Sequence, residues 1–163
     1  SGLVVSEMCI RDMPHSTRTC VGRVIVHLDS TPKDRDIAAI ISGYEDRVRS
    51  RGIAVRFCQT TDARKYESEI SRRSGSLVLL DQEGASMTSE EMAIWLKSAI
   101  IDGKTTNVAV GPHSGFSDEI KQSADQIISL SQLTLTHEMA AALLMEQLYR
   151  ASEINRGSQY HRD

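Results

Sequence analysis

The residues best placed to contact a ligand lie near the end of the chain. The run 129–135, Ser-Leu-Ser-Gln-Leu-Thr-Leu, is rich in hydroxyl groups, and the helix expected over 138–150 is apolar on almost every side. A helix of that kind must be buried. Amides and hydroxyls in a loop beside it can form hydrogen bonds to a polar group such as an adenosine or an amino acid. The pattern therefore suggests a ligand-binding loop.

Two earlier loops have the same character. Residues 80–84, Leu-Asp-Gln-Glu-Gly, and residues 111–115, Gly-Pro-His-Ser-Gly, each follow a continuous apolar run. Glycine lets the backbone approach a ligand closely. A glycine after a buried strand is more often part of a plain turn, so each loop taken alone is weak evidence for a pocket.

The elements that must position these loops alternate between two periods. We expect strands over 24–28, 53–57, 77–80, 108–110 and 127–130. We expect helices from Pro32 to about Gly52, over 62–73, from the capping box of Thr88 and Glu91 to Gly103, over 117–124, and over 138–150. This alternation predicts an α/β fold, with a mostly parallel sheet and helices on both faces. Ligands of such sheets bind outside the carboxyl ends of the strands, where all three loops lie.

Composition bounds the possible classes of protein. A chain of 163 residues, 40% hydrophobic, supports one core, and we expect a single domain over 21–163. Residues 1–20 lack periodicity and are expected to be a disordered or added tail, with an organelle-targeting remnant as the alternative. The net charge of −3 argues against coating nucleic acid by bulk charge, so any such contact must be local. No apolar run approaches the roughly 20 residues that cross a bilayer, which predicts a soluble protein without membrane contact.

Several common catalytic motifs are absent from the sequence. Gly111 and Gly115 are not followed by the Gly-Lys-Ser/Thr of a P-loop, and no Gly-x-Gly-x-x-Gly follows the first expected strand. His137-Glu138 lacks the second histidine of a zinc protease, and no serine lies in a Gly-x-Ser-x-Gly elbow. The three cysteines form no Cys-x-x-Cys pair. We therefore expect no metal site and favour neither an ATPase, a dehydrogenase nor a hydrolase.

The order and spacing of several short motifs resemble one known family. They are Leu79-Leu80-Asp81 with Gly84, Val110-Gly111 with Gly115, Leu130-Ser131 with Leu133-Thr134-Leu135 and His137, residues 145–151, and Tyr160-His161-Arg162. From about Leu77 to its end the chain is similar, without gaps, to the RlmH family of SPOUT-superfamily methyltransferases. Tyr44-Glu-Asp-Arg47 also resembles the Tyr-x-x-Arg of that family's first helix.

The resemblance implies a compact α/β fold whose last helix is threaded through a loop, forming a trefoil knot. Family proteins are homodimers that bind S-adenosylmethionine (SAM) in the knot and methylate N3 of a pseudouridine in the 23S rRNA of the large ribosomal subunit. The implied compartment is the cytoplasm, or an organellar stroma or matrix if the source is eukaryotic. The implied cofactor contacts are Leu80, Gly111, Leu130, Ser131, Gln132, Leu133, Thr134 and Leu135.

The resemblance also implies a role for the chain end. It places Tyr160, His161 and Arg162 of one subunit near the cofactor of the other. Arg162 would contact phosphate or the uracil edge, and His161 is a candidate proton acceptor because histidine titrates near neutrality. The alternative is a tail that simply packs or frays. Arg150 is a candidate RNA contact, or it is paired with Glu146 one helical turn earlier.

Two departures from the family pattern favour a second hypothesis. Pro112 stands where the family commonly has another glycine, and proline removes a backbone amide donor. Ala141 stands where many relatives carry arginine. Both features favour a catalytically weak SPOUT-fold protein that binds RNA or ribosomes without methylating them.

Overall fold

The chain folds around one parallel sheet. The structure, a computed structural model, describes residues 23–162, and His161 and Arg162 only in their backbone. The strands are β1 (Arg23–Leu28), β2 (Ile53–Phe57), β3 (Ser76–Ser86), β4 (Thr105–Val110) and β5 (Gln126–Ser129). Their order is β2-β1-β4-β3-β5, and every neighbouring pair is parallel. The predicted α/β class is confirmed.

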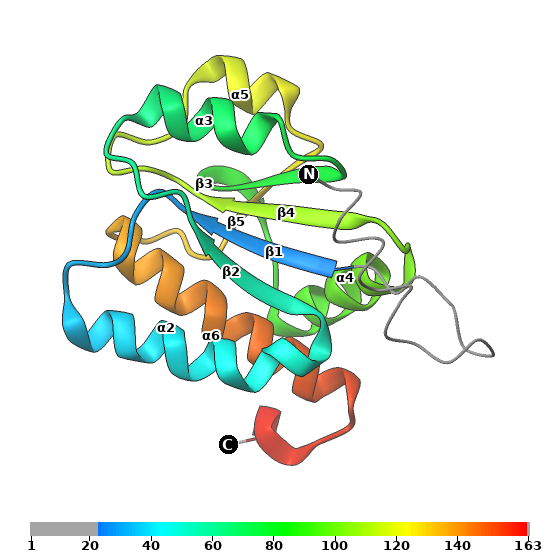
Figure 1. The fold of residues 1–163 in the computed structure, drawn as a ribbon. Helices are drawn as coiled ribbons and strands as arrows, with labels where there is room; N and C mark the ends of the chain where they lie inside the picture. The colour runs from blue at the N-terminus through cyan, green and yellow to red at the C-terminus, as the bar shows by residue number, and fades with distance from the viewer. Residues whose placement is uncertain (1–22, 163) are drawn as a thin grey trace, which may run out of the picture.

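Helices cover both faces of this sheet (Figure 1). The helical segments are α2 (Arg35–Val48), η1 (Arg49–Arg51), α3 (Ala63–Ser71), α4 (Ser89–Ile101), α5 (Asp118–Ser123), α6 (His137–Asn155) and η2 (Gln159–Arg162). Helices α2, α4 and α6 lie on one face, over a core that contains Val26, Val108 and Ile128. Helices α3 and α5 lie on the other, over Leu79 and Ala109. Consecutive strand residues point to opposite faces of the sheet, so each strand contributes side chains to both cores. Because helices cover both faces, both sets of side chains are buried.

Side-chain caps define where the helices begin. Thr88 and Glu91 form the predicted capping box at the start of α4. Asp34 accepts hydrogen bonds from the amides of Asp36 and Ile37, so α2 begins at Arg35 and not at Pro32 as predicted. Proline and the polar residues after it form the approach to the helix, and the capping aspartate decides its first turn.

The predicted end of the third strand is wrong. Residues 80–84 were expected to be a loop, yet β3 continues to Ser86. Leu80 and Ala85 both pair with Ile128, so residues 81–84 bulge between two pairings on β5. A Cβ on Gly84 would lie 2.7 Å from the backbone of Ile127 and Ile128, so only glycine permits this approach. In the sequence, charged residues followed by a glycine are typical of a turn. No local pattern reveals that β3 pairs with β5 again after the bulge.

Helix α6 is buried along most of its length, as its all-round apolar character predicts. Ala141, Leu144, Met145 and Leu148 are each at most 1% exposed, and the helix packs against α2 and α4. Met139 near its beginning is 49% exposed. The knot, and the domain boundary at residue 21, stay predictions; the expected tail over 1–20 lies outside the described residues.

Candidate functional site

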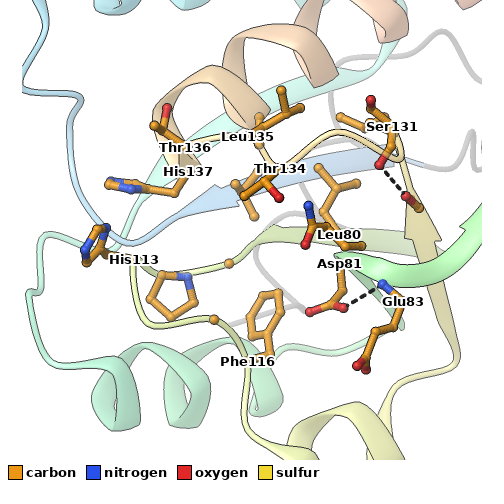
Figure 2. A pocket seen from close by; sticks show the side chains of 18 of the residues that line it. Leu80, Asp81, Glu83, His113, Phe116, Ser131, Thr134, Leu135, Thr136 and His137 are labelled. Carbon is orange, nitrogen blue, oxygen red and sulfur yellow. Dashed lines mark hydrogen bonds between the residues drawn. The ribbon is translucent and has the colours of Figure 1, made fainter.

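Three segments converge at the carboxyl ends of β3, β4 and β5 to form a cavity of about 640 Å³. They are the bulge of β3, the loop between β4 and α5, and the loop between β5 and α6, seen together in Figure 2. This edge of the sheet is where parallel α/β folds bind ligands. The three segments predicted to contact a ligand therefore lie around one cavity.

Seven of the eight expected cofactor contacts line this cavity. They are Leu80, Gly111, Leu130, Ser131, Leu133, Thr134 and Leu135. Gln132 is exposed and is not among the lining residues. Leu133 lines the cavity while 73% exposed, so it forms part of an open rim.

The floor of the cavity is anchored by a buried tyrosine. The Tyr66 hydroxyl of α3 lies 2.9 Å from the carbonyl oxygen of His27 and 2.7 Å from that of Val110, the residue before Gly111. Its ring also stacks near that of Phe116, with centroids 6.4 Å apart, and Phe116 lines the cavity. Burial raises the pKa of Tyr66 well above its ordinary value, so its hydroxyl stays a donor. Helix α3 thereby fixes the ends of β1 and β4 under the cavity.

The hydroxyl-rich loop before α6 forms hydrogen bonds within itself. Ser129 Oγ donates to the carbonyl oxygen of Ser131 at 3.0 Å, and Ser131 Oγ accepts from the Leu133 amide at 3.0 Å. Thr136 caps α6 by accepting from the Met139 amide. The two serines therefore hold the loop in shape, and the predicted contact of Ser131 with a ligand stays a prediction. The Thr134 hydroxyl forms no such bond among the described residues, and its side chain points into the cavity (Figure 2).

One wall of the cavity is charged. Lys121 Nζ lies 3.3 Å from Asp81 Oδ2 and 3.2 Å from Glu83 Oε2. Asp81 Oδ1 also accepts a hydrogen bond from the Glu83 amide at 2.9 Å. Hydrogen bonding to Glu83, with that to Asp81, raises the pKa of Lys121, so this wall keeps its ammonium at neutral pH.

Two histidines meet at the rim. The rings of His113 and His137 pack edge to face with centroids 5.8 Å apart, and both residues line the cavity (Figure 2). Within the described residues, the buried Nδ1 atom of His137 has no hydrogen-bond partner. His137 is the first residue of α6, and His113 follows Pro112 in the loop after β4.

Pro112 takes part in a tight turn at the cavity wall. Its carbonyl oxygen accepts from the Gly115 amide at 2.8 Å, and Gly115 has a positive φ of 79° that favours glycine. The turn is compatible with proline because it uses only the carbonyl. The amide that another residue would offer here is absent, and its effect on ligand affinity stays a prediction.

The chain end lies away from its own cavity, against the middle of α6. The Tyr160 hydroxyl donates to Glu146 Oε1 at 3.3 Å, and its ring lies 4.8 Å from that of Tyr149. Glu146 follows Ala140, the last residue of α6 that lines the cavity, by six residues, which corresponds to about 9 Å along a helix. Burial raises the pKa of Tyr160, with Tyr44 and Glu146 adding to the effect. The side chains of His161 and Arg162 are outside the described residues, so their predicted roles remain predictions.

Arg150 is engaged in the same place. Its guanidinium donates to Glu146 at 2.7 Å and lies 4.9 Å above the Tyr160 ring, so the predicted pairing with Glu146 is confirmed. Hydrogen bonding to Glu146 raises the pKa of Arg150. Arg47 stacks nearby on two tyrosine rings. We call this group the tail cluster: Tyr44, Arg47, Glu146, Tyr149, Arg150 and Tyr160.

Sequence reasoning missed the charged wall. Asp81 and Glu83 stood in a quoted loop, but no role was given to either, and Lys121 was not considered. A lysine on a short helix gives no sequence signal that it reaches a strand 40 residues earlier. Among residues 23–162, no group of three or more metal-ligating side chains is arranged to hold a metal ion. No helix within residues 23–162 is long and apolar enough to cross a membrane.

Comparison with known proteins defines the class. The family model described as "Predicted SPOUT methyltransferase" matches residues 29–161. Three curated relatives share the name "Ribosomal RNA large subunit methyltransferase H". That of Methylibium petroleiphilum is 35% identical over 115 residues, covering 71% of this chain and 73% of its own. Those of Prochlorococcus marinus and Dechloromonas aromatica are 38% and 37% identical, covering 72% and 79% of this chain and 81% of their own in both cases. The chain therefore belongs to the RlmH family of SPOUT methyltransferases.

Proposed function

We propose that this protein is a SAM-dependent methyltransferase that methylates N3 of a pseudouridine in the 23S rRNA of the large ribosomal subunit. One observation supports the proposal most strongly. Seven positions at which the family resemblance implies cofactor contacts surround a single cavity at the carboxyl edge of the sheet. The names of the relatives, which are ribosomal RNA methyltransferases, support the substrate class.

The cavity suits the chemistry of SAM. Its volume of about 640 Å³ falls in the usual range for sites that enclose a small molecule. Leu130, Leu133 and Leu135 offer apolar contacts to an adenine ring, and the charged wall suits an amino-acid group. Bound there, SAM would supply an electrophilic methyl group attached to a sulfonium.

The protein's own part in the reaction is alignment and proton removal. Methyl transfer is an in-line displacement, so the cavity must hold the acceptor nitrogen opposite the methyl group. A neutral N3–H must also lose its proton, for which His161 is the candidate acceptor. Arg162 would hold the RNA through phosphate or the uracil edge, and Arg150 would contact RNA through guanidinium N–H groups other than those that it donates to Glu146.

A homodimer would bring the chain end to a cavity. Tyr160 lies beside Glu146 in the middle of α6, about 9 Å along the helix from Ala140, which lines the cavity of its own chain. In the proposed dimer, the tail of one subunit completes the site of the other. We include in the proposal the trefoil knot around the cavity and a cytoplasmic location, or an organellar one if the source is eukaryotic.

A catalytically weak SPOUT-fold protein that binds RNA or ribosomes is the second candidate. Pro112 offers no amide at the cavity wall, and Ala141 is buried in the core with no polar group for a substrate. On this alternative the protein would bind its RNA target normally and have lost methyl transfer.

Two measurements separate these functions. The first is calorimetric titration of the protein with SAM, in which an absence of binding at millimolar cofactor would overturn the enzyme proposal. The second is mass spectrometry of 23S rRNA after ribosomes from a strain lacking the family enzyme are incubated with protein and SAM. One added methyl on a pseudouridine is expected. Ribosome binding without that methyl would favour the second candidate.

A further inference from the structure

The charged wall of the cavity joins residues from β3 and α5. Lys121 Nζ lies within 3.3 Å of carboxylate oxygens of Asp81 and Glu83, and all three residues line the cavity. The side chains of Asp81 and Lys121 are 15% and 20% exposed, whereas that of Glu83 is 80% exposed. Asp81 and Lys121 thus form the inner pair, and Glu83 holds the lysine from the solvent side.

The inner pair retains capacity for a ligand. Asp81 uses one oxygen on Lys121 and the other on the Glu83 amide, although an ionised carboxylate can accept about four hydrogen bonds. An ammonium carries three donors, of which two are directed at carboxylates here. Figure 2 shows the Asp81 carboxylate beside Phe116, on the opposite side of the cavity from Leu135.

A fixed carboxylate next to a fixed ammonium matches a ligand that carries the same two charges in the reverse order. The α-amino-acid group has an ammonium and a carboxylate on one carbon atom. The wall as a whole has two carboxylates against one ammonium, which suits SAM, whose ammonium, sulfonium and carboxylate leave one excess positive charge.

We propose that Asp81 and Lys121 bind the α-amino-acid end of the cofactor, with Asp81 accepting from its ammonium and Lys121 donating to its carboxylate. This assignment rests on the proposed SAM-dependent function. It directs the adenosine end toward the opposite loop of Thr134 and Leu135 and so fixes the direction in which the methyl group is presented. The competing view is that the pair only fastens the β3 bulge to α5.

Calorimetry with two ligands separates these views. The probes are SAM and methylthioadenosine, which has the adenosine and sulfur but lacks the amino-acid end. We expect Asp81→Asn to weaken SAM binding about tenfold and to change methylthioadenosine binding by less than about twofold. Equal weakening for both ligands would mean that the pair only shapes the cavity. Unchanged SAM binding would likewise overturn the assignment.

Lys121→Gln tests the other half of the pair independently. It should weaken SAM binding about tenfold. The affinity for decarboxylated SAM, which lacks the carboxylate that the lysine would hold, should hardly change. Equal loss for both ligands contradicts the assignment. Glu45→Gln is the matched control, because Glu45 of α2 is a 19% exposed carboxylate that forms an ion pair with Arg49 of η1. It should leave the affinity for every probe unchanged.

The same titrations keep two failures apart. If the unmodified protein does not bind SAM, the proposed function fails, and the assignment fails with it. If the unmodified protein binds SAM and both variants bind it equally well, only the assignment is overturned. Circular dichroism of each variant, compared with the Glu45→Gln control, establishes that the fold is retained.

Discussion

The beginning and the middle of α6 differ in how they use their polar groups. At its beginning, Thr134 and His137 line the cavity, and the buried Nδ1 atom of His137 has no hydrogen-bond partner among the described residues. Farther along, the tail cluster pairs its charges internally, with Arg150 bound to Glu146 and stacked on Tyr160. Unpaired polar groups at a cavity suit a ligand, whereas paired ones stabilise the chain itself. Within one chain, Tyr160 is therefore held at the middle of α6 and not at the cavity.

The largest expected effect comes from removing the side chains at the end of the tail. His161→Ala and Arg162→Ala should each lower turnover about a hundredfold while leaving SAM affinity nearly intact, because they would act on proton and RNA rather than on the cofactor. Turnover on ribosomes and calorimetric SAM affinity are the paired measurements. Equal loss of both would show that the tail supports the cavity and that the two regions are not separable.

Mixing variants decides whether the tail acts across a dimer. A His161→Ala protein and a cavity variant such as Gly111→Trp are each expected to be inactive. In an equal mixture of randomly paired dimers, about a quarter of sites would combine an intact cavity with an intact partner tail. Recovery of about a quarter of the activity supports the arrangement. Light scattering that reports a monomer at assay concentration would contradict it.

The next effect tests the framework of the cavity. Gly84→Ala would place a Cβ 2.7 Å from the backbone of Ile127 and Ile128, and should lower the free energy of unfolding by about 2 kcal/mol. Urea denaturation measures it. Gly43→Ala is the control, since apart from the adjoining backbone of α2 no atom of the described residues lies within 4 Å of its added Cβ, and it should be neutral or raise stability by about 0.5–1 kcal/mol. Equal effects at both positions would mean that the β3 bulge is not tightly packed.

The same bulge shows where sequence reasoning ends. Strand and helix alternation, the capping box of Thr88 and the buried character of α6 follow from local patterns, and the structure confirms them. The second pairing of β3 with β5 and the contact of Asp81 with Lys121 each join residues at least 40 positions apart. Such contacts depend on tertiary packing and leave no local period in the sequence.

The tail shows a second limit. The motif Tyr160-His161-Arg162 suggested a role through family resemblance, while the contacts of Tyr160 with Glu146 and Tyr149 were not foreseen. Tyrosine can both pack and donate, so its residue type does not distinguish an anchoring role from a catalytic one. Only its position beside α6 shows that it anchors the tail within its own chain.

A smaller effect is expected from the anchor below the cavity. Tyr66→Phe removes the hydroxyl that reaches the carbonyl oxygens of His27 and Val110 and keeps the ring against Phe116. We expect the free energy of unfolding to fall by about 1 kcal/mol, since the lost hydrogen bond is buried. Tyr160→Phe is the matched comparison in the tail cluster, where the hydroxyl bond is longer and less buried. Its unfolding free energy should change less, and a larger change there would reverse the contrast between the two regions.

The smallest effect concerns the pH dependence of the strand framework. His27 is fully buried, and its Nε2 lies 2.8 Å from Asn107 Oδ1. The Asn107 amide nitrogen donates to the carbonyl oxygens of Ser74 and Ser76, so Oδ1 accepts and His27 carries its proton on Nε2. Its Nδ1 has no partner among the described residues, and burial lowers the pKa of His27.

A lowered histidine pKa makes the folded state bind fewer protons than the unfolded state. His27 therefore costs no stability above about pH 6.5, the ordinary histidine value, and destabilises the fold progressively as the pH falls below it. His27→Gln keeps a hydrogen-bonding side chain but does not titrate. The loss of unfolding free energy between about pH 7.5 and pH 5.5 should be smaller in this variant than in the unmodified protein. If the variant loses as much unfolding free energy as the unmodified protein over this pH range, the acid sensitivity comes from groups other than His27.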